Sequence, residues 1–270
     1  MVGHMKELLI SAIVLLGGIS LPAPGQDKFA WPEGKRVAVS LSFDDARASQ
    51  VLTGLELFER HGVRVTFYVN PRSMEKHLAG WKKAVAQGHE IGNHSHTHPC
   101  SGNFPWSRQN SLEEYTIAKL EQDIETADRE IERLLGVRAT TFAYPCGSKF
   151  VGRGAHTQST VPLVARRFRA GRGFRDVAAN DPGYCDLAQL FGIDSDTMTF
   201  EKMKDAVVKA EPIGGWVVFA GHEIGKPRSQ TTEAAVLEEF LTYAKDPANG
   251  IWLDTVDAVA RYVEKQRAKR

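Results

Sequence analysis

The stretch VAVSLSFDD, residues 37–45, is a run of apolar and small residues that ends on two adjacent carboxylates, Asp44 and Asp45. Its composition and length predict a buried strand over Val37–Phe43. Two like charges side by side repel each other, which is costly unless they share a cation or a proton. Such a pair is also a common cap of a following helix, so the stretch alone leaves both interpretations open.

Strand and helix patterns alternate along the rest of the chain. Further strands are predicted over Val63–Val69, His89–Asn93, Thr140–Tyr144, Ala188–Ile193, Trp216–Ala220 and Ile251–Leu253. Helices are predicted over Val51–Arg60, Lys76–Gln87, from a capping box at Ser111 to Leu135, over Thr232–Lys245, and from Thr255 onward. This alternation implies βαβ units and a parallel sheet. We therefore predict a single-domain α/β barrel of seven or eight parallel strands, with an open sheet as the alternative.

Composition narrows the function classes. The chain has 270 residues, of which 42% are hydrophobic and 25% charged, and its formal net charge is +1. A length of this order suits one barrel domain, and a near-neutral charge gives no reason to expect a nucleic-acid partner. Three cysteines are too few for a disulfide scaffold. Neither common nucleotide-binding glycine motif occurs, so we expect no organic cofactor.

The N-terminus has the pattern of a secretory signal peptide. Lys6 precedes the apolar run Leu8–Leu21, and the small residues Ala23-Pro24-Gly25 follow it. The run is short for a membrane span, although a retained anchor is the alternative. We expect a signal peptide over residues 1–25, a short extension over 26–35 and the folded domain over 36–265. The mature protein would then be secreted or periplasmic, with no integral membrane association after cleavage.

Two further polar clusters follow predicted strands, one at His94–His98 and one at Gly221–Glu223. Because reactive groups gather at the C-terminal ends of parallel strands, both clusters are expected to lie near the aspartate pair. His94 and His98 are four residues apart, a spacing that suits two ligands of one metal ion. Two histidines and one aspartate also form the three-ligand set that leaves an open position on a catalytic zinc-like ion.

Three motifs resemble those of a known family: Ser42-Phe-Asp-Asp45, Gly92-Asn-His-Ser-His-Thr-His-Pro99 and Thr141-Phe-Ala-Tyr-Pro-Cys-Gly147. In order and spacing they are similar to motifs of the NodB-homology polysaccharide deacetylases, carbohydrate esterase family 4, over about Arg36 to Tyr262. The resemblance implies a distorted (β/α) barrel that removes N- or O-linked acetyl groups from a polysaccharide or oligosaccharide. The wording of THPCSGNFPW and FAGHEIG further resembles a divergent, gellan-lyase-associated subgroup.

The same resemblance implies a role for each polar residue. Asp44 would be the general base and His222 the general acid, while Asp45, His94 and His98 would hold one divalent metal ion. Zn²⁺ is the expected ion, with Co²⁺, Ni²⁺ and Mn²⁺ as alternatives. Metal-dependent hydrolysis therefore needs no other cofactor.

Two more site residues come from the resemblance. The backbone N–H of Cys146 would help to hold the oxyanion, and Asp194 would align with the aspartate that tunes the acid histidine. Cys100 and Cys146 both fall near the expected site, either as a disulfide or as separate thiols. Phe104 and Trp106 follow the histidine motif directly, and they either stack on sugar rings or pack in the core.

The chain departs from the family pattern at three positions. Ala143 stands where the third motif normally begins with an arginine that orients the base, and Met198 and Ala220 replace a tryptophan and a leucine of the acetyl pocket. We therefore expect a pocket that is wider or differently built. Five arginines are candidates to replace the missing one: Arg166, Arg167, Arg169, Arg172 and Arg175. Charge runs of this kind usually face water, and a groove for an anionic polysaccharide is the functional alternative.

Two other functions remain open at this point. A catalytically impaired carbohydrate-binding protein that kept the barrel is favoured by the missing arginine, whereas the complete set of aspartates and histidines argues against it. A glycan lyase or glycosidase is the other alternative. Glycosidases need a carboxylate pair that flanks the bond and no metal, so the histidines would have no explanation.

Overall fold

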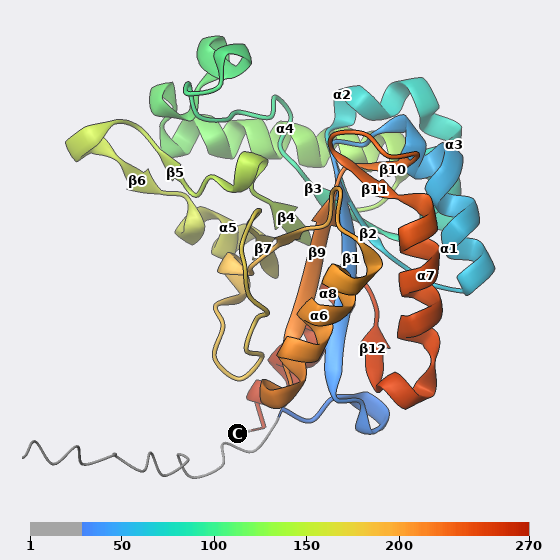
Figure 1. The fold of residues 1–270 in the computed structure, drawn as a ribbon. Helices are drawn as coiled ribbons and strands as arrows, with labels where there is room; N and C mark the ends of the chain where they lie inside the picture. The colour runs from blue at the N-terminus through green and yellow to red at the C-terminus, as the bar shows by residue number, and fades with distance from the viewer. Residues whose placement is uncertain (1–28, 270) are drawn as a thin grey trace, which may run out of the picture.

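The computed structural model describes residues 29–269, in which parallel strands curl into a half-barrel surrounded by helices (Figure 1). The order of neighbouring strands is β7-β4-β3-β2-β1-β9-β8, and β12 pairs with β1. The strands are β1 (Val37–Asp44), β2 (Thr66–Val69), β3 (Glu90–Asn93), β4 (Thr141–Ala143), β7 (Ala170–Arg172), β8 (Ile193–Asp194), β9 (Trp216–Gly221) and β12 (Ile251–Leu253). An isolated parallel bridge between Arg172 and Leu190 links β7 to the segment before β8. The predicted single-domain α/β barrel class is thus confirmed, in an incompletely closed form.

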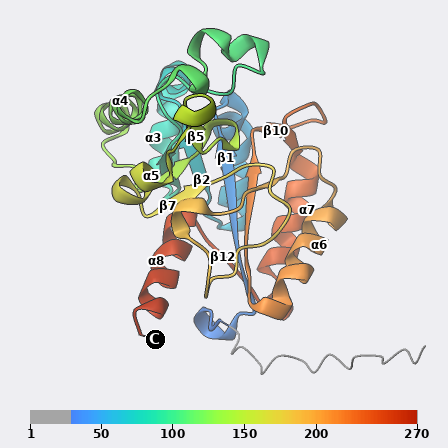
Figure 2. The same cartoon turned by 90° about the vertical axis from the view of Figure 1, so that its left-hand side faces the viewer.

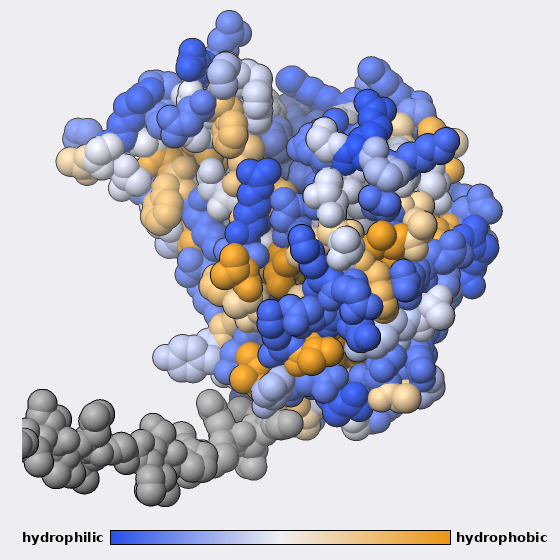
Figure 3. Space-filling view, in the orientation of Figure 1, coloured by the Kyte–Doolittle hydropathy of each residue, from blue (hydrophilic) through white to orange (hydrophobic). Residues whose placement is uncertain are grey.

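Helices cover the sheet on both sides. Figure 2 shows α3, α4, α5 and α8 on one side of the sheet and α6 and α7 on the other. Their bounds are α1 (Leu55–His61), α2 (Pro71–Met74), α3 (Leu78–Ala86), α4 (Ile117–Leu135), α5 (Val161–Arg167), α6 (Phe200–Ala210), α7 (Ala234–Lys245) and α8 (Val256–Arg267). Among the described residues, no helix combines the length and apolarity that crossing a bilayer requires. The face seen in Figure 3 is mainly hydrophilic, with its hydrophobic residues in small separate groups.

Alternation along β1 explains how one strand serves both the core and the site. Successive side chains of a strand point to opposite faces. One face carries the apolar side chains of residues 37, 39, 41 and 43, which join the largest core cluster with Phe67 and Phe219. The other face carries Ala38, Ser40 and Ser42 and ends at Asp44, all of them buried. The second carboxylate, Asp45, comes one residue later, where the backbone has left the strand.

Some element boundaries differ from those predicted. The long helix α4 begins after Thr116, whose hydroxyl accepts a hydrogen bond from Lys119 N, and the capping box at Ser111 opens only a single 3₁₀ turn instead. The strand predicted over Ala188–Ile193 is reduced to Ile193–Asp194 in β8. Strand β7 and helix α6 were not predicted. Three-residue strands such as β7 are too short for a period to stand out in the sequence.

Two pairs of short strands and a π-helical turn also lie between these strands and helices. β5 (Phe150–Val151) and β6 (Gln158–Ser159) form a small antiparallel pair, whereas β10 (Glu223–Gly225) and β11 (Thr231–Glu233) pair in parallel. A single π-helical turn, η2 (Gln50–Gly54), precedes α1 where one continuous helix over Val51–Arg60 was predicted. The predicted signal peptide, residues 1–25, lies outside the described residues.

Candidate active site and metal centre

Asp45, His94 and His98 converge at the C-terminal end of the sheet. The Nε2 atoms of His94 and His98 lie 3.5 and 3.3 Å from the same oxygen, Oδ1 of Asp45. One ligand atom from each of the three residues falls within 4.8 Å of the others. Two nitrogens and one carboxylate oxygen at such a spacing suit a zinc-like ion and leave further coordination positions open. The predicted ligand residues are therefore brought together, and their donor set fits a divalent metal.

Backbone partners orient both imidazoles. His94 follows β3 directly, and its Nδ1 lies 2.9 Å from the carbonyl oxygen of Ala143, at the end of β4. This carbonyl assigns the proton to Nδ1, which leaves the Nε2 lone pair directed at the site. His98 has a left-handed backbone conformation, with φ of 52°, and its N–H donates to Ser95 Oγ at 3.0 Å. The loop geometry thus turns His98 back toward His94.

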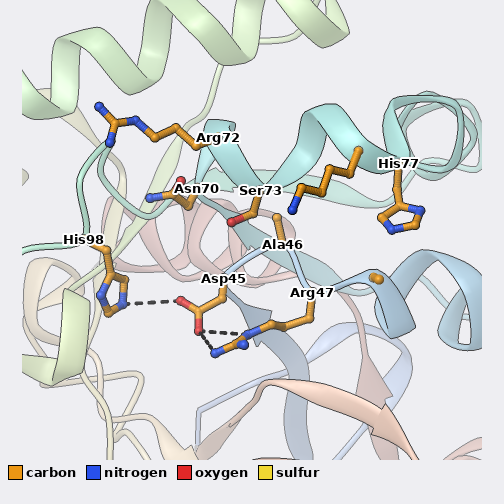
Figure 4. A pocket seen from close by; sticks show the side chains of 10 residues that line it. Asp45, Ala46, Arg47, Asn70, Arg72, Ser73, His77 and His98 are labelled. Carbon is orange, nitrogen blue, oxygen red and sulfur yellow. Dashed lines mark hydrogen bonds and ion pairs between the residues drawn. The ribbon is translucent and has the colours of Figure 1, made fainter. Parts of the chain in front are cut away.

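Arg47 holds the second oxygen of the ligand carboxylate. Its Nη2 and Nε donate to Asp45 Oδ2 at 2.8 and 3.2 Å, which leaves Oδ1 facing the two histidines (Figure 4). Burial by itself would raise the pKa of Asp45, but the charges of His94 and His98 outweigh it and lower the pKa to about 2. The carboxylate is therefore ionised at neutral pH.

Asp44, at the end of β1, forms a buried ion pair with Arg172 of β7, although β4, β3 and β2 lie between these two strands in the order of the sheet. Arg172 Nη2 donates to Asp44 Oδ1, and both side chains are closed to solvent. Burial alone would raise the pKa of Asp44, but the charge of Arg172, with those of His94 and His222, holds it below its usual value. Asp44 is thus kept as a carboxylate in a position where an isolated one would take up a proton.

Arg172 takes the place of the arginine that the family pattern has at the position of Ala143. The two residues are direct partners in the pairing of β4 with β7, so the guanidinium enters at the level where the family pattern expects an arginine, from the adjacent strand. The interpretation of the arginine cluster as a solvated helix end is wrong for Arg172, which is fully buried. It also does not hold for Arg167 and Arg169, which are part-buried and paired with carboxylates.

His222, the predicted general acid, has a different carboxylate partner from the expected Asp194. His222 Nδ1 lies 2.6 Å from Asp196 Oδ2, and the N–H of His222 donates to Asp196 Oδ1 at 3.1 Å. Asp194 instead faces Arg175 at 3.4 Å and accepts from the N–H of Asp196. The carboxylate that contacts His222 is therefore Asp196, two residues beyond the predicted Asp194. Burial alone would lower the pKa of His222, but the hydrogen bond to Asp196 and the charge of Asp44 raise it.

A buried glutamine links the backbones of Asp44 and His222. Gln50 Nε2 donates to the carbonyl oxygens of both Asp44, at 2.6 Å, and His222, at 2.9 Å. Sequence reasoning missed this residue, because a single glutamine at the start of a helical pattern carries no signal of burial. Its location in the π-helical turn η2 is what brings its amide between the ends of β1 and β9.

One cavity of about 380 Å³ joins these groups. Its lining includes Asp44, Asp45, His94, His98, Cys146, Phe174, His222 and Gln230. Phe174 packs edge-on against the His222 ring, with centroids 5.3 Å apart. Ala220 is fully buried and Met198 is partly buried against the core, and neither lines this cavity.

The cysteines and aromatic residues resolve two open alternatives. Cys100 and Cys146 form a disulfide that joins the histidine loop to the turn after β4. Phe104 and Trp106 are stacked on each other, with centroids 5.5 Å apart, and they line the same cavity. Trp106 is 64% exposed, which excludes a core position. The pair presents an aromatic surface beside the His98 ring, 6.1 Å from that of Trp106.

Strained backbone is concentrated around the cavity. Five of its lining residues other than glycine have positive φ angles: Asp45, His98, Cys146, Arg175 and Gln230. Each such conformation costs roughly 1–3 kcal/mol and persists only where the surroundings enforce it. Residues in sparsely populated conformations gather at functional sites, and this clustering supports the assignment of the cavity as the candidate active site.

An α/β half-barrel with a two-histidine, one-aspartate ligand set at its strand ends defines a class of site suited to metal-assisted hydrolysis. Comparison with known proteins places the chain more narrowly. Residues 32–160 match the family model described as "Polysaccharide deacetylase". This match places residues 32–160 in the polysaccharide deacetylase family, as the resemblance implied.

Individual relatives cover limited parts of the sequence. The chain is 32% identical to a gellan lyase from Bacillus sp over 120 residues, which are 44% of this chain and 4% of that protein. It is 39% identical to the peptidoglycan-N-acetylglucosamine deacetylase PgdA of Listeria monocytogenes over 66 residues, 24% of this chain and 14% of PgdA. The chain spans about a quarter or less of the length of the curated relatives it matches.

Solved structures share the fold over most of the chain. A probable polysaccharide deacetylase from Pseudomonas aeruginosa PAO1 is 18% identical, with a TM-score of 0.65 over 87% of this chain and 93% of its own. A family 4 acetyl xylan esterase from Clostridium thermocellum, solved with a cobalt ion, is 18% identical with a TM-score of 0.53, over 82% of this chain and 89% of its own. At this identity the likeness establishes the fold alone.

Proposed function

We propose that this protein is an exported, metal-dependent hydrolase that removes acetyl groups from a polysaccharide or oligosaccharide. One observation carries the proposal: a single cavity holds the Asp45, His94 and His98 ligand set with an ionised Asp44 and a protonatable His222. Membership of the polysaccharide deacetylase family supports the reaction class. Export rests on the N-terminal pattern of residues 1–25.

The residues of the chain divide the proton transfers between them. Asp44, held as a carboxylate by Arg172, accepts a proton from the attacking water. Burial would lower the pKa of His222, but the hydrogen bond to Asp196 raises it. His222 therefore carries a proton that it donates to the leaving amine or alkoxide. The backbone N–H of Cys146 is proposed to stabilise the oxyanion. A divalent ion held by the ligand set would supply Lewis acidity and favour ionisation of water.

Zn²⁺ is the proposed ion, because two imidazoles and one carboxylate form a typical catalytic zinc set. A relative of the same fold was solved with cobalt, which shares much of the ligand preference of zinc, and this keeps Co²⁺ among the alternatives. A glycan substrate is supported by the names of the relatives and by the exposed Phe104 and Trp106 pair, since aromatic rings stack on sugars.

The proposal is tested by acetate release from chitooligosaccharides, peptidoglycan and acetylated xylan, with metal analysis of the purified protein. We expect release from at least one of them, lost with chelator, restored by Zn²⁺ and abolished in Asp44→Asn. An exposed acid outside the site, Glu56→Gln, serves as the matched control. A folded, metal-loaded protein that binds these glycans but releases no acetate would favour the binding-only alternative.

The position of Arg172 weighs against the binding-only alternative. That alternative rested on the absence of the arginine that orients the base, and Arg172 occupies that role from β7. Among the described residues, the proposed base Asp44, the proposed acid His222 and the three proposed metal ligands are all present in the cavity.

A further inference from the structure

A second cavity adjoins the metal centre on its other side. It measures about 540 Å³ and shares Asp45, Arg47 and His98 with the first cavity. Its outer wall comes from α2 and the following 3₁₀ turn, η3 (Glu75–His77). Figure 4 shows Asp45 and His98 together, with Arg47 on one side and Ser73 and Arg72 on the other. We call this cavity the basic pocket.

Cations dominate the lining of the basic pocket. Arg47, Arg72 and Lys76 carry positive charges, His77 is titratable, and Asp45 is the one carboxylate among the lining residues. Asp45 is already committed to Arg47 and to the ligand set. A concave wall of one charge sign focuses the electrostatic potential and attracts ions of the opposite sign.

Among the described residues, the two outer cations, Arg72 and Lys76, have no carboxylate partner. Arg72 Nε donates to His96 Nε2 at 3.1 Å, and within residues 29–269 neither Arg72 nor Lys76 forms an ion pair. The nearest acid along the chain, Glu75, faces Arg133 of α4 at 3.6 Å instead. By contrast, the rim arginine of the first cavity, Arg175, already faces Asp194. The basic pocket thus offers charge that the protein itself does not neutralise.

Neutral hydrogen-bonding groups lie between these cations. The hydroxyl of Ser73 and the amide of Asn70 both line the basic pocket. Asn70 is anchored by its own hydrogen bond to the carbonyl of His96, at 2.9 Å, so its position is set by the histidine loop. Charged groups mixed with a hydroxyl and an amide suit a ligand that carries both a carboxylate and hydroxyl groups, as a uronic acid does.

We propose that the basic pocket binds the carboxylate of a uronic acid unit next to the acetylated unit of the substrate. The proposal rests on the proposed function, because a glycan with its acetyl group at the metal centre must continue into a neighbouring cavity. Arg72 supplies a planar fork that pairs with a carboxylate in two-point contact, and Lys76 supplies a second charge. The substrate is accordingly an acidic polysaccharide, and the basic pocket selects it.

The test compares two substrates that differ only in charge: an O-acetylated oligogalacturonate and its methyl ester. For each, kcat/KM for acetate release is measured with the zinc-loaded protein. We expect the wild type to prefer the free acid by about tenfold or more, as for a hydrogen bond between charged groups. In Arg72→Gln/Lys76→Gln the ratio of the two kcat/KM values should fall to about one. Lys76→Glu should invert the preference, because it replaces attraction with repulsion.

A matched double variant controls for net charge. Lys82→Gln/Arg138→Gln removes two exposed charges that lie outside both cavities and should keep the wild-type ratio. Equal wild-type rates on acid and ester, or a preference that survives in Arg72→Gln/Lys76→Gln, would overturn the basic pocket as a uronate site. Failure of the proposed function looks different: no acetate would then be released from either substrate or from acetylated xylan.

Discussion

Arg172 and Asp44 illustrate how a single buried pair sets the state of the proposed base. Both side chains are closed to solvent, and the guanidinium also lies over the ring of Tyr68, 5.0 Å from its centroid. Removing one partner of a buried pair leaves an uncompensated charge, which costs about 3–5 kcal/mol. The pair therefore links stability to the ionisation of Asp44.

We predict that Arg172→Met lowers the free energy of unfolding by about 3–5 kcal/mol at neutral pH. Because Arg172 lowers the pKa of Asp44, its contribution is present above the unfolded-state pKa and is lost as the pH falls through the folded-state value. The acidic limb of kcat/KM should move to higher pH, since Asp44 must be ionised to accept a proton. Urea unfolding and pH–rate profiles measure both effects. The exposed Arg166→Met should show neither, and an unmoved acidic limb would contradict the assignment.

A second prediction separates Asp196 from Asp194. Asp196→Asn removes the carboxylate against His222, so the pKa of His222 should fall. His222 then loses its proton at lower pH, and the alkaline limb of kcat/KM should move to lower pH. The rate near neutral pH is expected to drop about 100-fold or more. Asp194→Asn should leave that limb in place. If the two variants behaved in the opposite way, the partner inferred from sequence would be the correct one.

At the scale of elements, the loops after β3 and β4 act as one unit. The disulfide between Cys100 and Cys146 joins them, two residues beyond the ligand His98 and at the turn that presents the proposed oxyanion N–H. Cys100 Sγ lies 3.7 Å from Nδ1 of His98. The disulfide therefore limits the motion of the proposed metal ligand His98 relative to the turn after β4.

We predict that Cys100→Ala/Cys146→Ala lowers the free energy of unfolding by about 4 kcal/mol. This follows from the chain entropy of a loop with a sequence separation of 46 residues. Zn²⁺ affinity should fall as well, because His98 gains freedom in the apo state. Denaturant unfolding and calorimetric zinc titration test the two parts. Cys185→Ala removes the remaining thiol, outside the site, and should change neither. A zinc affinity equal to that of the wild type would show that the histidine loop holds its shape without the disulfide.

At the scale of the whole molecule, a bound ion would connect the ends of two strands. Asp45 follows β1, whereas His94 and His98 follow β3, and β2 lies between these strands in the sheet. A ligand that binds only the folded state stabilises it in proportion to its affinity and concentration. Metal binding should therefore appear as an increase in global stability.

We predict that Zn²⁺ at about 1,000 times its Kd stabilises the protein by about 4 kcal/mol. The melting temperature should rise with Zn²⁺ and fall with chelator, as measured by differential scanning calorimetry. Asp45→Asn should abolish the shift by removing the carboxylate that both histidines face. His77→Gln, which changes a histidine outside the ligand set, should retain it. An unchanged shift in Asp45→Asn would place the ion elsewhere.

Much of the fold and of the proposed ligand set could be predicted because short stretches of the sequence carry the relevant patterns. A buried strand ending on Asp44 and Asp45 has a period and an endpoint that can be recognised in nine residues. The spacing of His94 and His98 is likewise a property of one loop. Residues whose partners come from distant segments were harder to predict from the sequence. Arg172 was one of five candidate arginines, Asp194 was predicted in place of Asp196, and Gln50 was not predicted at all.

By itself, the order of apolar runs and polar strand ends determined the parallel α/β architecture and gathered the aspartates and histidines at one edge. Only the tertiary structure decided which arginine meets Asp44, which aspartate meets His222, and which cations share the basic pocket. The reason is physical. A strand's own side-chain pattern establishes that it is buried, whereas its neighbours and their register depend on how distant segments pack.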